Sequence, residues 1–196
     1  MADTGNIRNI ILLGHGGSGK TSLAEAILHK TGTTSRLGSV DDKTSICDFY
    51  DEEKEHQHSI QSATVHVEHG GKLINIIDTP GYPDFIGPAI KAMPAAETAV
   101  IVISASAGIE TNTRKMFELT AKENMPRIIV INKMDADNVA LGELIKNIQE
   151  TAGSQCRCAN LPGADKASII DCIENETGDS PVMDVAQAHT DLIESV

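Results

Sequence analysis

The feature that most constrains this chain is the octapeptide Gly14–Thr21, which reads Gly-His-Gly-Gly-Ser-Gly-Lys-Thr. The apolar run Ile10–Leu13 before it predicts a buried strand, and Ser22–Leu28 after it predicts a helix. In this context the backbone N–H groups of a glycine-rich turn can surround a phosphate. Lys20 can reach the outer phosphates of a nucleotide, and the Thr21 hydroxyl can ligate Mg²⁺. The complete pattern disfavours the alternative, a flexible glycine turn.

Strand and helix patterns alternate along most of the chain. This alternation predicts an α/β fold, with a doubly wound, mostly parallel sheet and flanking helices. The polar stretch 31–62 has no clear period, which is typical of a functional or mobile segment. Strands are expected at Ile7–Leu13, Ala63–Glu68, Leu73–Ile77, Ala99–Ser104 and Arg127–Ile131, and short strands at Gln155–Leu161 and Ser168–Ile173. Helices are expected up to about Lys30, from about Asp84 within limits set by Pro88 and Pro94, over Glu110–Glu123, and over Val139–Glu150.

Composition narrows the class of protein further. A chain of 196 residues fits one domain with a possible appendage, and aromatic residues make up only 3%, so the core must be aliphatic. The residues after Met1 lack the apolar run of a secretion signal, so none is expected, and no apolar run is long enough to span a membrane. The four cysteines lack zinc-site spacing and predict reduced thiols in a cytoplasmic protein.

The net charge of −12 is concentrated in two segments. Residues 41–55 hold seven acidic residues and two lysines, and residues 161–196 hold eight acidic residues and one lysine. Both segments can be solvated surface, and we favour that interpretation for the second. Because no basic stripe accompanies them, we expect no direct sequence-specific binding of nucleic acid and no membrane partner.

Two further motifs end apolar strands. In a doubly wound sheet, ligands bind at the carboxyl ends of the strands, so these motifs should converge with Gly14–Thr21 on one crevice. Within Asp78–Gly81, the aspartate can hold Mg²⁺ and the Gly81 N–H can approach a γ-phosphate closely. On its own this tetrapeptide could be a simple turn, but behind a phosphate-binding loop a functional role is favoured.

Residues Asn132–Asp135, which read Asn-Lys-Met-Asp, predict selection of the base. A carboxylate at Asp135 can accept two N–H bonds from guanine, whereas adenine offers no such pair of donors. The Lys133 stem can cover the base, and Asn132 can tie loops together. The alternative is a helix N-terminus that is merely capped by Asp135.

The order of these three motifs resembles that of the translational GTPases. Additional stretches at Pro83–Phe85 and Ala107–Glu110 resemble the G domain of the elongation factor G family. The resemblance implies a P-loop GTPase that uses Mg²⁺, hydrolyses GTP to GDP and phosphate, acts on the ribosome as a partner, and is a cytoplasmic monomer. The nucleotide-binding residues it implies are Gly14, His15, Gly16, Gly17, Ser18, Gly19, Lys20, Thr21, Ser22, Asp78, Thr79, Pro80, Gly81, Asn132, Lys133 and Asp135.

The resemblance also implies catalytic and metal-binding residues, with two departures from the family pattern. Thr21, Asp78 and Ser59 are the expected Mg²⁺ ligands, and Ser59 stands where the family usually has threonine. Lys20, Gly81 and Tyr82 are the expected catalytic residues, and Tyr82 stands where the family usually has histidine. A phenol is a poor base at neutral pH but could still orient a water molecule, so we expect slow unaided hydrolysis.

Residues 1–153 are expected to form an incomplete GTP-binding core, and residues 154–196 the start of an inserted subdomain. The resemblance implies that a final core strand and a Ser-Ala guanine loop are missing, so the chain is expected to be an N-terminal fragment of a longer factor. Two other functions remain as alternatives. One is a nucleotide-sensing module with little useful hydrolysis; the other is an ATP-using kinase or ATPase, which Asp135 disfavours.

Overall fold

The computed structural model describes residues 3–137, 139–165 and 168–195. The chain divides into two compact units, Met1–Lys133 and Met134–Val196. The division falls before the predicted boundary at residues 153 and 154, and helix α5 (Leu141–Ala152) belongs to the second unit. The assignment of residues 1–153 to the GTP-binding core and 154–196 to an inserted subdomain stays a prediction.

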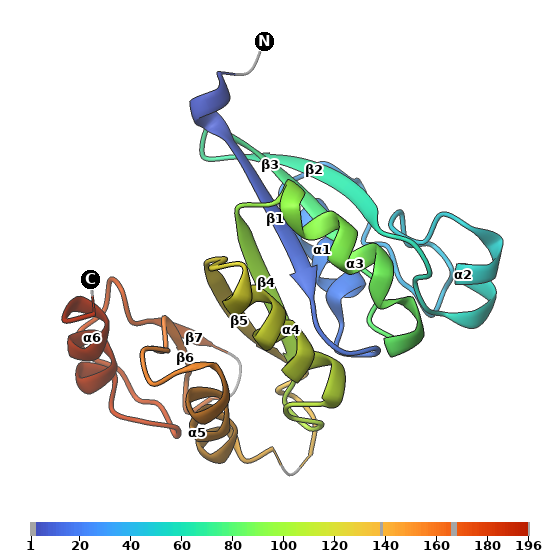
Figure 1. Ribbon diagram of the computed structural model, residues 1–196. Coiled ribbons are helices and arrows are strands. Elements are labelled where there is room, and N and C mark those ends of the chain that lie inside the picture. The colour runs from blue at the N-terminus through green and yellow to red at the C-terminus, as the bar shows by residue number, and fades with distance from the viewer. Residues whose placement is uncertain (1–2, 138, 166–167, 196) are drawn as a thin grey trace. The chain divides into compact units, whose positions relative to one another are not determined.

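A five-stranded sheet forms the centre of the first unit (Figure 1). Its order is β2-β3-β1-β4-β5, and all neighbouring pairs are parallel except the β2–β3 hairpin. The predicted α/β class with a mostly parallel sheet is therefore confirmed. The strands are β1 (Ile7–Leu13), β2 (Ala63–His69), β3 (Lys72–Asp78), β4 (Thr98–Ser104) and β5 (Arg127–Asn132).

Both faces of this sheet are covered by other elements. Successive side chains of each strand point to opposite faces and so pack against both layers. On one face, Leu12 packs with Ala24 and Leu28 of helix α1 (Lys20–Lys30). The neighbouring residues Ile11 and Leu13 point to the other face and are fully buried. Figure 1 shows α1 behind the sheet, with α3 (Ile86–Ala92) and α4 (Thr111–Lys122) in front of it.

The strand register aligns the carboxyl ends of the parallel strands. Leu12 lies opposite Asp78 of β3, Leu13 opposite Ile101 of β4, and Ser104 opposite Asn132 of β5. The loops that follow these strands therefore leave from the same edge of the sheet. This is the physical reason why motifs far apart in the sequence can form one site.

Some predicted boundaries differ from the observed ones. The segment 31–62 contains a short helix, α2 (Asp51–His56), which its polar sequence did not indicate. The helix expected from Asp84 begins as a 3₁₀ turn, η2 (Pro83–Phe85), and continues as α3, because Pro83 favours a helical first turn. A second 3₁₀ turn, η3 (Met93–Ala95), holds Pro94 and ends this helical stretch.

The second unit contains α5, a two-stranded antiparallel sheet and helix α6 (Val185–Ile193). Its strands β6 (Asn160–Pro162) and β7 (Ile169–Asp171) are shorter than the predicted runs. A small core of Leu161, Cys172, Val185 and Ala188 holds β6, β7 and α6 together. The sequence analysis did not anticipate α6.

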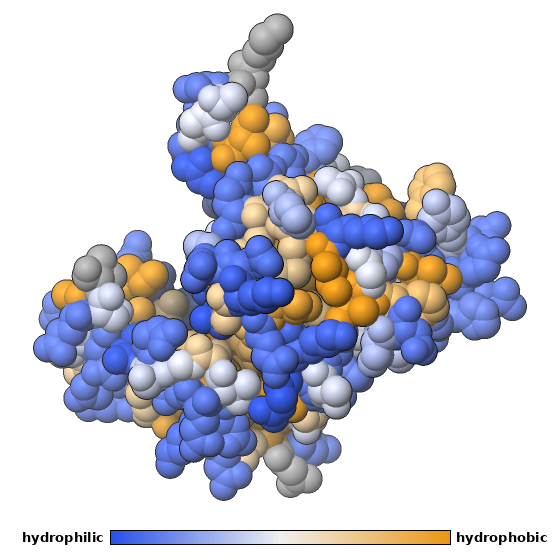
Figure 2. Space-filling view, viewed as in Figure 1, coloured by the Kyte–Doolittle hydropathy of each residue, from blue (hydrophilic) through white to orange (hydrophobic). Residues whose placement is uncertain are grey.

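The exposed surface combines acidic and apolar areas. Figure 2 shows a hydrophilic surface over α2 and an apolar area over α3, where Ile90 is 41% exposed. In the second unit, Glu174, Glu176 and Asp179 are exposed, as expected for a solvated acidic segment. Within the described residues, no helix is long and apolar enough to cross a membrane.

Candidate functional site

The glycine-rich loop between β1 and α1 takes backbone conformations that need glycine. Gly14, Gly17 and Gly19 have φ angles of 141°, 75° and 96°. A Cβ atom at position 14 would collide with the Val102 carbonyl oxygen, and one at position 19 with the Asn132 amide. The loop therefore turns tightly at the carboxyl end of β1 and exposes its backbone to an incoming group.

The ammonium group of Lys20 is buried inside this loop. Its Nζ donates hydrogen bonds to the carbonyl oxygens of Gly14, at 3.3 Å, and His15, at 2.9 Å. A Cβ atom on Gly81 would collide with this Nζ and with the Gly16 N, so the backbones of the two motifs are in close approach. Burial lowers the pKa of Lys20 to about 8, against the opposing effect of Asp78 and Glu110.

The three predicted metal ligands lie beside Lys20 and are linked by contacts between their side-chain oxygens. The Thr21 hydroxyl donates to Asp78 Oδ2 at 2.6 Å and lies 3.5 Å from Ser59 Oγ. Ser59 Oγ donates in turn to Asp48 Oδ1 at 3.1 Å. Burial raises the pKa of Asp78 to about 6, although the Thr21 hydrogen bond and Lys20 act in the opposite direction.

The oxygen atoms of these side chains are suitable ligands for a hard cation. Hydroxyl and carboxylate oxygens are the ligands that Mg²⁺ prefers, and the ion usually keeps several waters. Asp78 Oδ1 is buried and has no hydrogen-bond partner among the described residues, which leaves it free to accept from such a water. The predicted set of Thr21, Ser59 and Asp78 is thus compatible with Mg²⁺, with Asp48 as an additional nearby carboxylate.

The remaining residues predicted to touch the phosphates occupy different positions. Ser18 is buried, its Oγ has no partner within the described part of the chain, and Ser22 is exposed. The Thr79 hydroxyl donates to the Leu12 carbonyl at 2.6 Å and so fixes the turn that contains Pro80. His15 Nε2 lies 3.4 Å from Glu110 Oε1.

The predicted base-binding motif begins at the same sheet edge. Asn132 Nδ2 donates to the Ser18 carbonyl at 3.0 Å, so Asn132 ties β5 to the loop, as predicted for it. Lys133 follows with a positive φ of 59°, which turns the chain sharply out of the strand. Asp135 belongs to the second unit, and its contact with guanine stays a prediction.

Tyr82 directly follows Gly81 and is 43% exposed. Its ring lies against the backbone of Gly16, since a Cβ atom there would be 2.9 Å from Tyr82 Cε2. Buried Asn112 donates from Nδ2 to the Gly81 carbonyl at 2.8 Å and anchors the turn before Tyr82. The phenol is thus positioned at the solvent-facing side of the glycine-rich loop.

Sequence reasoning missed four buried polar residues that organise this site. Glu25 of α1 is fully buried, and its Oε1 accepts from the Ser45 hydroxyl at 3.0 Å and from the N–H groups of Ile46 and Cys47. Asn112 had no sequence signal at all. Asp48 and Glu53 belong to an acidic run that composition alone could not separate into buried and solvated members.

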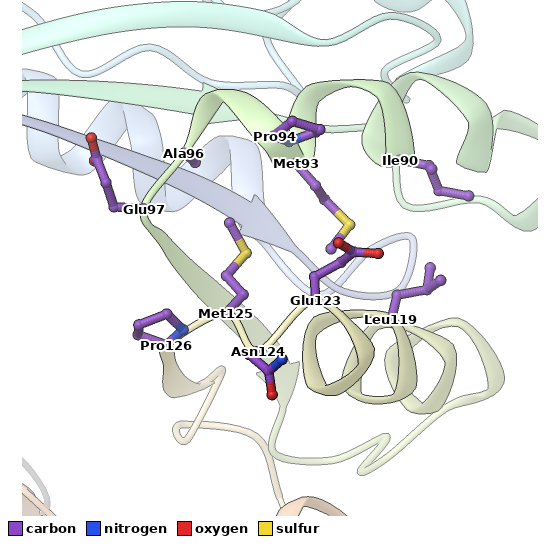
Figure 3. A pocket seen from close by; sticks show the side chains of 10 residues that line it. All are labelled: Ile90, Met93, Pro94, Ala96, Glu97, Leu119, Glu123, Asn124, Met125 and Pro126. Atoms are coloured by element: carbon purple, nitrogen blue, oxygen red, sulfur yellow. The ribbon is translucent and has the colours of Figure 1, made fainter.

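A different cavity, of about 440 Å³, lies between α3 and α4 at the amino ends of β4 and β5 (Figure 3). Figure 3 shows the side chains of Met93 and Met125 pointing into this space. Its ten lining residues include Glu97 and Glu123 but no lysine, arginine or histidine. An anionic phosphate would therefore be disfavoured there, and the loop site at the opposite edge is the candidate for nucleotide binding.

The chain is similar to known proteins over almost its whole length. The family described as "Elongation factor Tu GTP binding domain" matches residues 5–193. An elongation factor G-like protein of Mycobacterium tuberculosis is 35% identical over 161 residues, which are 82% of this chain and 22% of that protein. The mitochondrial ribosome-releasing factor 2 of Bos taurus is 36% identical over 173 residues, which are 87% of this chain and 22% of that protein.

A solved structure from Thermus thermophilus has a TM-score of 0.85 and 28% sequence identity, and the match covers 96% of this chain and 31% of that one. The chain spans about a fifth of the length of the curated relatives it matches. The family match covers nearly the whole chain and includes the glycine-rich loop and both strand-end motifs. The chain therefore belongs to the elongation factor Tu-type family of translational GTPase domains, and it is a GTP-binding domain.

Proposed function

We propose that this domain binds GTP together with Mg²⁺ and hydrolyses it to GDP and phosphate as part of a factor that works on the ribosome. The observation that carries the proposal is the convergence of Lys20, Thr21, Asp78 and Gly81 at one sheet edge. The relatives named elongation factor G-like protein and ribosome-releasing factor 2 support the ribosome as partner.

Each residue has a role that its surroundings support. The backbone N–H groups of Gly16–Thr21 would donate hydrogen bonds to phosphate oxygens. The Lys20 ammonium would exchange its two carbonyl partners for the outer phosphates. Gly81 would present its N–H to the γ-phosphate, where any side chain would collide with Lys20. Tyr82 would orient the attacking water from the solvent-facing side.

Thr21, Ser59 and Asp78 are the proposed residues for Mg²⁺, with Asp78 acting through a water. When bound there, the ion would neutralise negative charge on the phosphate oxygens. Anionic phosphates beside Lys20 would also favour its protonated form, and so reverse the effect of burial on its pKa. We propose that Asn132, Lys133 and Asp135 hold the guanine base.

Titration calorimetry with GTP, GDP and ATP in Mg²⁺ tests the binding half of this proposal. We expect uptake of guanine nucleotides only, and loss of that preference in Asp135→Ala, with Asp137→Ala as the matched control. Removing the carboxylate leaves two guanine donors unpaired, which we expect to weaken binding by about 3 kcal/mol, or roughly a hundredfold. Equal affinity for ATP and GTP in the unchanged protein would contradict the proposal.

Hydrolysis needs its own measurement. A tyrosine at position 82, where the family usually has histidine, favours a second candidate function, a nucleotide-sensing module. A nucleotide-sensing module would bind GTP but turn it over no faster with ribosomes than without them. We expect ribosomes to stimulate phosphate release, and Lys20→Ala to abolish that stimulation while exposed Lys30→Ala on the same helix retains it. Tight GTP binding without stimulated turnover would assign the sensing function instead.

A further inference from the structure

Three rings from two separate segments meet beside the glycine-rich loop. The ring centroid of His58 lies 4.9 Å from that of Tyr82, with the planes at 61°, and 5.9 Å from that of Phe85, with the planes at 27°. His58 comes from the polar segment 31–62, whereas Tyr82 and Phe85 follow the strand-end motif Asp78–Gly81. Edge-to-face and offset-stacked rings at these separations attract one another.

Tyr82 also contacts the glycine-rich loop. The ring atoms Cε2, Cζ and Cδ2 all lie within 3.1 Å of the place that a Cβ on Gly16 would occupy. The ring therefore contacts both the Gly16 backbone and the imidazole of His58. Because Tyr82 is 43% exposed, these contacts, rather than enclosure in a core, limit the motion of its ring.

The chain around His58 is built to keep this imidazole in place. Gln57 has a positive φ of 56° and ends α2, and the His58 N–H donates to the Glu53 carbonyl at 3.2 Å. His58 Nδ1 lies 3.0 Å from the His56 carbonyl oxygen, which fixes the plane of the ring. On the other side, the N–H groups of Ile60 and Gln61 both donate to Glu53 Oε1, at 2.8 and 3.0 Å.

We propose that His58 is a positioning residue for GTP hydrolysis, whose ring holds Tyr82 across Gly16 in the orientation needed at the phosphate site. This inference rests on the role proposed above for Tyr82, and it adds the residue that controls the geometry of that side chain. A flexible, half-exposed phenol would spend little time in a productive orientation, and misplacement of about 1 Å can reduce a rate a hundredfold. His58 acts through the shape and packing of its ring.

The hold on the ring can be measured without any catalysis. The chain has two tyrosines and no tryptophan, so Tyr50→Phe leaves Tyr82 as the single fluorescent reporter. In that background we expect His58→Ala to lower the anisotropy of Tyr82 and to raise its quenching by acrylamide. We expect His58→Phe to preserve both values, and His66→Ala, which removes an exposed histidine of β2, to leave them unchanged. Unchanged Tyr82 anisotropy in His58→Ala would overturn the inference.

The second measurement is ribosome-stimulated GTP hydrolysis by the same variants. We expect His58→Ala to lower kcat about tenfold with KM and Mg²⁺-dependent GDP affinity within twofold of the parent, because the phosphate contacts remain. His58→Phe should recover most of the rate, and a His58→Phe variant as slow as His58→Ala would overturn the packing role. If Tyr82→Ala hydrolyses GTP as fast as the parent, the role proposed for Tyr82 fails, whatever the anisotropy shows.

Discussion

At the level of single residues, the site contains two pairs in which a side chain fits only because its neighbour is a glycine without a Cβ atom. The Tyr82 ring occupies the space where Gly16 would carry a side chain, and Lys20 Nζ occupies the corresponding space at Gly81. Close approach of backbones is what glycine makes possible, so these glycines report tertiary contacts rather than local turns.

The Gly16–Tyr82 contact makes a prediction about stability. Gly16→Ala should destabilise the protein by about 1–3 kcal/mol, because its methyl group would overlap the Tyr82 ring. The same substitution in a Tyr82→Ala background should cost much less, since the space is then empty. Urea unfolding of the four proteins of this double-mutant cycle gives the coupling energy directly. Additive effects would show that the ring can move aside freely.

Tyr82 makes a second prediction, which concerns rate. Tyr82→His introduces a group whose unperturbed pKa is near neutrality, so it can accept a proton as well as orient a water. We expect ribosome-stimulated GTP turnover to rise about tenfold or more, with GTP affinity unchanged. Phosphate release under saturating GTP is the measurement, and no change or a loss would show that the phenol suits this site better than an imidazole.

At the scale of elements, two buried carboxylates organise the segment 31–62: Glu25 of α1 attaches it to the rest of the first unit, and Glu53 ties its own turns together. Glu25 accepts from residues 45, 46 and 47, while Glu53 accepts from the N–H groups of Phe49 and Tyr50 with one oxygen and of Ile60 and Gln61 with the other. These bonds replace the ladder hydrogen bonds that a strand would have supplied. A largely irregular segment thereby takes a definite path past the proposed Mg²⁺ ligands.

The attachment at Glu25 can be tested through Cys47, a buried thiol whose pKa is raised by burial and by the carboxylates around it. Glu25→Ala would leave the Ser45 hydroxyl and the Ile46 N–H without the oxygen that accepts from them, while the Cys47 N–H keeps Ser45 Oγ at 3.1 Å. We therefore expect a loss of about 2–4 kcal/mol in the free energy of unfolding. Alkylation of Cys47 should accelerate at the same time, because the segment opens more often.

Peptide mass spectrometry separates Cys47 from the other three cysteines, and Glu25→Gln, which keeps one acceptor oxygen, should lie between the parent and Glu25→Ala. Exposed Glu118→Ala on α4 provides a control for loss of a surface carboxylate. Equal alkylation rates in the parent and Glu25→Ala would mean that other contacts hold the segment.

At the scale of the whole molecule, the nucleotide-free protein carries an electrostatic cost in its binding site. Both Lys20 and Asp78 are almost completely buried, and burial disfavours the charged form of each. Under the function proposed above, the same groups would contact phosphate and metal, so binding of nucleotide and metal should relieve this cost.

This cost predicts the pH dependence of stability. Asp78 has a pKa of 3.8 in the unfolded chain and about 6 in the folded one, so the folded state binds the extra proton between these values. The contribution of Asp78 to stability is therefore fully present below pH 4 and is lost as the pH rises through 6. From pH 4 to 6, the free energy of unfolding of Asp78→Asn should rise by about 3 kcal/mol relative to that of the parent.

Urea unfolding at several pH values, without nucleotide and in the presence of EDTA, measures this difference. Asp84→Asn, an exposed carboxylate close in sequence, is the control and should show no such interval. In the presence of GDP and Mg²⁺ the parent should be the more stable of the two proteins near pH 7, because it binds both ligands and Asp78→Asn binds the metal poorly. A parent protein whose stability relative to Asp78→Asn is constant from pH 4 to 6 would contradict this account.

Local patterns in the sequence were sufficient to predict the strands and the motifs at their ends. Apolar runs ending in the three motifs predicted strands β1, β3 and β5, a further apolar run predicted β4, and the parallel sheet then required their carboxyl ends to meet at one edge. That geometry is general for the fold class, so the residues of the phosphate loop and the two strand-end motifs could be named without coordinates.

Which polar residues outside those motifs are buried, and what they contact, depends on packing between distant segments and could not be predicted from local patterns. The acidic run 41–55 has the composition of a solvated surface, yet Asp48 and Glu53 are buried in it, and His58 is placed on Tyr82 by a helix that the sequence did not predict. Burial of a charge depends on partners far away along the chain, and no local period records those partners.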